Sequence, residues 1–252
     1  MDFNAYFARH PLLIPLFIWI ILLIVLTIAI AIRVALHLSI YSQQVIADVT
    51  VLAFCIGLLT SFGWWKRIGF WNPGSIRDIP LFIPLILLIV VIYSIPSSNL
   101  PGYTYLSLLA LAILIGFTEE IFFRGLLLES LLPAGITRAV LLSAVLFGLP
   151  HLLKIVSGIW DPYFAIAATL FATGIGICFA ALRIRTGTIW PLIGIHILID
   201  YNALISGGFE VHTGSIGTIL WGIVIGGILA IYGLYLIRKE YAIKGNVYIS
   251  GN

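Results

Sequence analysis

The sequence predicts an all-α, polytopic membrane protein in which about eight transmembrane helices surround a buried polar cavity. Of its 252 residues, 62% are hydrophobic and only 9% are charged. A soluble domain normally carries about 25% charged residues. Mean hydropathy is +1.16, and no basic patch with interleaved aromatic residues indicates nucleic-acid binding. We therefore expect the lipid bilayer to be the chain's main partner, with no nucleic acid.

Apolar stretches of about 20 residues, the length a helix needs to cross a bilayer, recur along the chain. The expected spans are 12–32, 45–63, 80–96, 104–125, 138–156, 163–183, 187–206 and 216–237. The first is longer than the roughly 7–15 apolar residues of a signal peptide, so we expect it to be retained. No internal repeat or soluble domain interrupts the series, which predicts a single membrane domain, residues 1–252, with a motif-bearing core at about 104–206.

Lysine and arginine residues lie mostly on one side of the predicted spans. Apart from Arg124, which falls inside a span, only Arg33 and Lys154 fall on the other side. The side that includes the N-terminus carries Arg9, Lys66, Arg67, Arg77, Arg138, Arg183, Arg185, Arg238, Lys239 and Lys244. Because short cytoplasmic loops are rich in these residues, we expect both termini in the cytoplasm.

Small residues in the apolar runs predict packing rather than chemistry. Cys55 and Cys178 both lie in such runs and are expected to be core residues, not a disulfide or a metal pair. Gly222 and Gly226, four residues apart in the last span, predict a close helix–helix contact, within one chain or between copies.

Glu119, Glu120 and Arg124 follow an uncharged run, 106–117, inside an otherwise apolar span. A charge at membrane depth costs about 3 kcal/mol even on the lenient insertion scales, so these residues indicate a functional site. A structural ion pair between Glu120 and Arg124, one helical turn apart, is the simplest alternative. That pair would still leave Glu119 unexplained.

His151 follows Pro150 in the fifth span. The proline removes a backbone N–H and frees the carbonyl of Leu146, so we expect a kink beside the histidine. A lone histidine in such a place is more often a packed, hydrogen-bonded residue than a ligand, and the alternative is a place on a cavity, where irregular backbone is tolerated at membrane depth.

His196 and Asp200 share one face of the seventh span because they are four residues apart. Either Asp200 only orients the imidazole, or both residues line one cavity with Glu119 and His151. Burying ionisable groups in three separate places would cost more than gathering them in one water-filled pocket, so we expect them to converge.

Two histidines and several carboxylates in one pocket suit two kinds of chemistry. One is a divalent metal such as zinc, held by Glu119, His151 and His196, that activates water. The other is a metal-free general base with polar groups that stabilise an oxyanion. The His-Glu-x-x-His signature of common zinc proteases is absent, and the residues leave both mechanisms open.

The ordered motifs Glu119-Glu120-x-x-x-Arg124, Phe147-x-x-x-His151 and His196-x-x-x-Asp200 resemble those of the CPBP (Abi) family of intramembrane proteases, which includes the CAAX prenyl endopeptidases. The resemblance covers about residues 104–206 and implies a fold of eight spans. It also implies that Glu119 activates the attacking water with the help of His151. His196 and Asp200 would bind or polarise the scissile carbonyl, and Glu120 would pair with Arg124.

Asp200 departs from the family pattern, because CAAX-cleaving members commonly have asparagine at this position. An asparagine amide can donate a hydrogen bond to an oxyanion, whereas an ionised aspartate cannot. The departure weakens the expectation of CAAX specificity more than the expectation of proteolysis.

These features together predict an intramembrane endopeptidase that acts on membrane-associated peptides or prenylated C-termini. We expect its pocket to open toward the cytoplasm, because Glu119 lies a few residues from the predicted cytoplasmic end of its span. The alternative is a non-enzymatic membrane protein: a proton-coupled transporter, or a scaffold with an inactive protease-like site. Buried Glu, His and Asp residues also serve proton relays, but transporters often show internal repeats, which this chain lacks.

Overall fold

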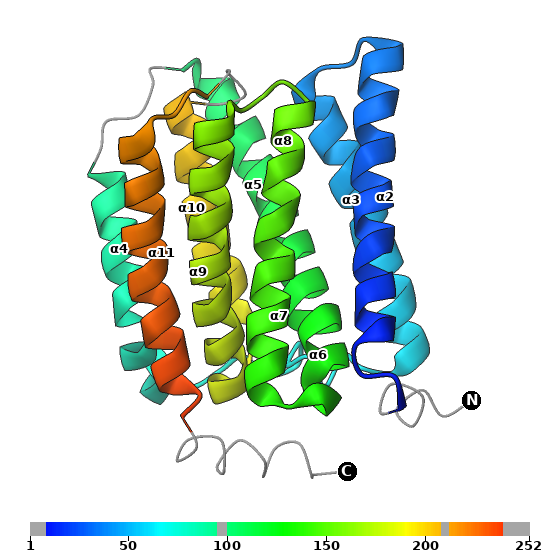
Figure 1. Cartoon of the computed structure of the whole chain (residues 1–252), viewed down its shortest axis with the longest axis vertical. Coiled ribbons are helices and arrows are strands. Elements are labelled where there is room, and N and C mark those ends of the chain that lie inside the picture. The colour runs from blue at the N-terminus through cyan, green and yellow to red at the C-terminus, as the bar shows by residue number, and fades with distance from the viewer. Residues whose placement is uncertain (1–8, 95–99, 208–211, 239–252) are drawn as a thin grey trace.

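The chain forms a bundle of helices that run roughly parallel or antiparallel to one another (Figure 1). The computed structural model describes residues 9–94, 100–207 and 212–238. The elements are α2 (Leu13–Leu36), α3 (Ile40–Phe62), η1 (Ile76–Phe82), α4 (Ile83–Tyr93), α5 (Gly102–Glu120), η2 (Ile121–Leu127), α6 (Leu128–Leu131), η3 (Leu132–Ala134), α7 (Ile136–Gly148), η4 (Leu149–Leu152), α8 (Leu153–Val156), α9 (Pro162–Thr186), α10 (Trp190–Gly207) and α11 (Ile216–Leu236). The predicted all-α membrane fold is confirmed.

Within the described residues, seven helical segments are long and apolar enough to cross a membrane. The predicted span 187–206 is not among them, although α10 forms a helix in that place. Its polar residues His196, Asp200 and Asn202 lower its hydropathy. Instead of facing lipid all round, α10 packs against α5 inside the bundle. The seventh predicted helix is therefore present, but composition alone does not make it a membrane span.

The start of α2 and the end of α11 lie at the same end of the bundle (Figure 1). Residues 37–39, which connect α2 to α3, lie at the opposite end of the bundle. We call this end the α2–α3 end. This arrangement is the one that an even number of passes produces. The cytoplasmic location of the termini stays a prediction, and Lys239 and Lys244, which contributed to it, lie outside the described residues.

The helix that carries Glu119 is longer than the predicted span 104–125. The helical run continues from Gly102 to Ala134 over 33 residues, or about 50 Å at 1.5 Å per residue. The buried Glu129 carboxylate is neutralised by Arg67, 2.8 Å away, which allows the run to continue past residue 125. Glu119 therefore lies near the middle of the run, and the reason for expecting a cytoplasmic opening is removed.

Helices α9 and α11 pack through glycine, as the Gly222/Gly226 pair predicted, and they do so within one chain. A Cβ atom added to Gly226 would lie 2.8 Å from the Leu170 carbonyl oxygen and 3.1 Å from the Phe171 Cα atom. Backbone cannot move aside as a flexible side chain can. The small residue therefore sets the distance between the two helices.

We expect Gly226→Ala to lower the free energy of unfolding by about 1–3 kcal/mol, because the added methyl group overpacks this contact. Gly227→Ala is the matched control: an added Cβ there meets nothing within 4 Å, so that substitution should be neutral or slightly stabilising. Thermal unfolding of the purified protein in detergent measures both. Equal melting temperatures for the two variants would contradict the close α9–α11 contact.

Candidate active site

The Glu120 carboxylate joins two of the predicted motifs. Its Oε1 atom lies 2.7 Å from Arg124 Nη1 and 2.7 Å from His196 Nδ1, so it accepts hydrogen bonds from both. Glu120 has no exposed surface. The predicted Glu120–Arg124 ion pair is present, but the contact with His196, from a helix 76 residues further along the chain, was not predicted.

Arg124 lies between two aromatic rings. Its Cζ atom is 4.1 Å from the centroid of the Phe147 ring and 5.0 Å from that of Phe179. The guanidinium is almost fully buried, and a cation–π contact is worth about 2 kcal/mol or more when it is desolvated. Arg124 belongs to the π-helical segment η2, a conformation often found at functional sites. Through these two rings, Arg124 joins α7 and α9 to the helical run of α5 and η2.

The second nitrogen of His196 faces the two remaining carboxylates. Nε2 lies 3.6 Å from Glu119 Oε2 and 3.6 Å from Asp200 Oδ2. Because Nδ1 donates to Glu120, Nε2 is the atom left for chemistry. Distances of 3.6 Å are slightly longer than direct hydrogen bonds and suit contacts completed by water or substrate.

A glycine allows α5 and α10 to approach closely enough for these contacts. A Cβ atom added to Gly116 would lie 2.9 Å from Ile197 Cγ1 and 3.1 Å from the Ile197 backbone nitrogen. Gly116 precedes Glu120 by one helical turn, and Ile197 directly follows His196. The close approach therefore brings the Glu120 carboxylate to the imidazole.

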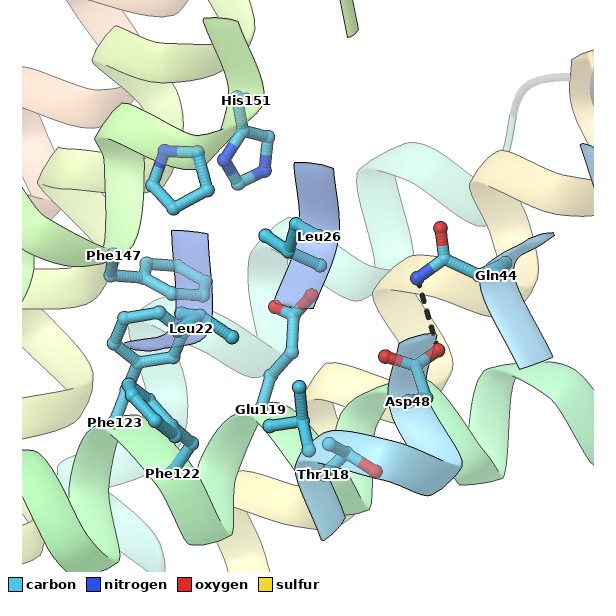
Figure 2. Close-up of a pocket in the computed structure, with 12 residues that line it drawn as sticks. Leu22, Leu26, Gln44, Asp48, Thr118, Glu119, Phe122, Phe123, Phe147 and His151 are labelled. Carbon is cyan, nitrogen blue, oxygen red and sulfur yellow. Dashed lines mark hydrogen bonds between the residues drawn. The ribbon is translucent and has the colours of Figure 1, made fainter. Parts of the chain in front are cut away.

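Two small cavities adjoin these residues and share Phe147 and His151 in their walls. The first, shown in Figure 2, is also lined by Glu119 and holds about 50 Å³ of space that water can enter. The second, lined also by His196 and Asp200, holds about 60 Å³. A water molecule needs about 10–15 Å³ by this measure, so each cavity has room for a few waters.

His151 occupies the wall between the two cavities. The predicted irregularity beside Pro150 is present: α7 ends at Gly148 and a 3-10 turn, η4, carries the histidine. His151 Nδ1 lies 3.1 Å from the Gly148 carbonyl oxygen, which can only accept, so Nδ1 donates and Nε2 of the neutral ring is an acceptor. The ring also stacks on Trp160, with a centroid distance of 5.9 Å.

The structure thus places Glu119, Glu120, Arg124, His196 and Asp200 in one cluster, with His151 on the adjoining cavities. The sequence also suggested Glu119, His151 and His196 as metal ligands, and this set is not found as a metal-binding group in the described part of the chain. Among the residues that the structure describes, no three His, Cys, Asp or Glu side chains are grouped so that they could hold a metal ion. The residues as placed therefore do not fit a metal.

Several buried polar atoms of the cluster have no hydrogen-bond partner within the described residues: Glu120 Oε2, Arg124 Nη2, Asp200 Oδ2 and Thr118 Oγ1. Buried polar groups in native proteins are almost always paired, with protein or with water. Thr118 lines the first cavity and Asp200 lines the second. Water inside the two cavities is the natural partner for these two atoms.

Asp48 and Gln44 of α3 also line the cavity that contains Glu119 (Figure 2), and the sequence reasoning missed both. The predicted span begins at residue 45, which leaves Gln44 just outside it and puts Asp48 in its first turn. In the structure α3 begins at Ile40, and Asp48 is only 4% exposed. The signal was the same as for Glu119: a carboxylate inside an apolar helix.

The comparison with protein families agrees with the three motifs. Residues 101–202 match the model described as Type II CAAX prenyl endopeptidase Rce1-like. No curated protein and no solved structure matches the chain. The matched segment contains all six candidate residues predicted from the sequence, whereas Asp48 lies before it. Residues 101–202 of this multi-pass membrane protein therefore form an Rce1-like type II CAAX prenyl endopeptidase domain of the CPBP family.

Proposed function

We propose that the protein is an intramembrane endopeptidase that hydrolyses a peptide bond with Glu119 as the general base. The observation that carries the proposal is the position of Glu119. Its carboxylate points into a water-sized cavity that His151 also lines, and its Oε2 atom lies 3.6 Å from His196 Nε2. A base, a water site and an electrophilic partner are the parts that peptide hydrolysis requires.

Glu119 and Glu120 have separate roles because their surroundings differ. Glu120 is fully buried, and its Oε1 atom already accepts two hydrogen bonds. The Glu119 side chain keeps 29% of its surface exposed. Of the two carboxylates, Glu119 is the one free to take a proton from water.

The hydrolytic step uses one water molecule and no other reactant. Glu119 takes a proton from the water while the water oxygen bonds to the scissile carbonyl carbon, and the carbonyl π pair moves onto its oxygen. The C–N bond then breaks, and the leaving nitrogen takes the proton from Glu119. Nε2 of His151 can accept the second water proton in a hydrogen bond and so orient the water.

His196 and Asp200 are suited to the carbonyl side of the reaction. When Nε2 of His196 carries a proton, it can donate to the oxyanion that forms, and Glu120 fixes the ring from the other side. Asp200 Oδ2, 3.6 Å from the same nitrogen, orients the imidazole. This assignment gives Asp200 a role that an ionised carboxylate can fill.

Apolar walls support a membrane-associated or prenylated peptide as the substrate. Leu22 and Leu26 of α2 line the cavity beside Glu119, together with aromatic rings that include Phe122 and Phe123 (Figure 2). Such walls favour lipid-like or apolar groups over charged ones. The space inside suits water, so the scissile bond is expected to approach its edge while the rest of the substrate stays in the bilayer.

We expect Glu119→Gln to lower kcat/KM by about 10²–10⁴-fold, because the amide cannot take a proton from water. Purified protein in proteoliposomes would be given a prenylated CAAX reporter and a panel of membrane peptides, with product release measured by mass spectrometry. Asp78→Asn, in η1 and away from the cluster, serves as the control. An inactive wild type on every substrate, or a fully active Glu119→Gln variant, would defeat the proposal.

Glu120→Gln is expected to act through stability as well as activity. It leaves Arg124 buried without its charged partner, a change that costs about 3–5 kcal/mol. Thermal unfolding should show a clearly lower melting temperature for Glu120→Gln, while Glu119→Gln unfolds close to the wild type. Equal losses in the two variants would show that the division of roles between the carboxylates is wrong.

A further inference from the structure

We propose that Asp48, Gln44 and Lys154 form a polar path that brings water to Glu119 from the α2–α3 end of the bundle, and that Asp48 positions this water. The role of the water rests on the proposed function. The path itself does not, and it can be tested without any substrate.

Asp48 carries a buried carboxyl group that has no role among the residues already assigned to the site. It is 4% exposed, lies two turns inside α3, and lines the same cavity as Glu119 and His151. In Figure 2 its carboxylate lies across the cavity from His151, to one side of Glu119. Thr118 Oγ1, buried and without a partner in the described part of the chain, lines this cavity as well. Two carboxylates and an unpaired hydroxyl around one space form a site built for water.

Gln44 and Lys154 continue the polar lining away from Glu119. Gln44 Nε2 donates to Asp48 Oδ2 at 3.0 Å, and Lys154 Nζ donates to Gln44 Oε1 at 3.0 Å. Both ends of the Gln44 amide are therefore fixed. Lys154 follows His151 by three residues, so the chain of hydrogen bonds ties α3 to the segment that carries the histidine. Charged or titratable groups that interact electrostatically with Asp48 include Lys154, Asp200, His196 and Glu119.

The position of these residues along α3 gives the path its direction. Gln44 is four residues from the start of α3 and Asp48 eight, which corresponds to about 6 Å and 12 Å from the α2–α3 end. In the other direction, every residue from 120 to 131 is buried, and Leu126 and Leu127 have no exposed surface. Water can therefore approach from the α2–α3 end and is blocked toward the chain termini.

This direction reverses the one expected from the sequence. If the lysine- and arginine-rich end faces the cytoplasm, the path opens on the opposite face of the membrane. The water for hydrolysis would then come from that face.

The path is tested first without an activity assay. Gln44→Cys is introduced into the full chain with Cys55 and Cys178, both buried and free, replaced by alanine. Sealed vesicles of known orientation, reported by a C-terminal tag, are treated with a membrane-impermeant thiosulfonate. We expect labelling only from the face opposite the tag, and no labelling of a Leu127→Cys control from either face. Labelling from the tag face, or none at position 44, overturns the path.

Asp48→Asn then tests the positioning role on whichever substrate the wild type cleaves. The asparagine oxygen can still accept from Gln44, so the fold and melting temperature should persist. We expect kcat to fall about 10- to 100-fold, as misplaced reactants do, with KM within about twofold and one ionisation lost from the pH–rate profile. Asp78→Asn should change none of these.

An unchanged kcat and pH profile in Asp48→Asn would overturn the positioning role and reduce Asp48 to a structural residue. If the wild type cleaves nothing, the proposed function fails while the labelling result still decides the path. If the wild type cleaves but position 44 does not label from the face opposite the tag, the path fails and the proposed function stands.

Discussion

The Glu120 carboxylate is the constraint on which the site depends. Removing a charge from water costs several kcal/mol, and only good geometry offsets that cost. Here one oxygen accepts hydrogen bonds from Arg124 and His196, both at 2.7 Å. Arg124 in turn contacts the rings of Phe147 and Phe179. Four helical elements, α5 with its π-helical extension, α7, α9 and α10, are held in register by one buried charge.

That constraint also separates two neighbouring carboxylates. Successive residues of a helix point about 100° apart, because 3.6 residues make a turn. When Glu120 is directed at Arg124 and His196, Glu119 is turned toward the cavity beside His151 (Figure 2). A structural charge and a reactive charge thus follow from one helix orientation. The close approach at Gly116, where a side chain would meet Ile197, keeps that orientation fixed against α10.

The surroundings of the cluster differ at the two ends of the bundle. Toward the termini, residues 120–131 are packed into the core, and Glu129 is neutralised by Arg67. Toward the α2–α3 end, Asp48, Gln44 and Lys154 are joined by hydrogen bonds. Polar groups at membrane depth are tolerated where they line a cavity. The site is therefore lined by polar side chains toward the α2–α3 end and closed by tightly packed residues toward the chain termini.

The membrane class, the approximate positions of the helices and the three motifs could be predicted from the sequence alone, because hydropathy and i,i+4 spacing are local properties. It also predicted the Glu120–Arg124 pair, which lies within one helical turn. Three features could be seen only in the folded chain: His196 binds Glu120, Asp48 lines the cavity, and the helix that carries Glu119 continues to Ala134. Each of these features depends on residues far apart in the chain. The continued helix, for example, contains Glu129, whose charge is neutralised by Arg67, 62 residues earlier. Packing between helices chooses such partners, and periodicity within one helix cannot reveal them.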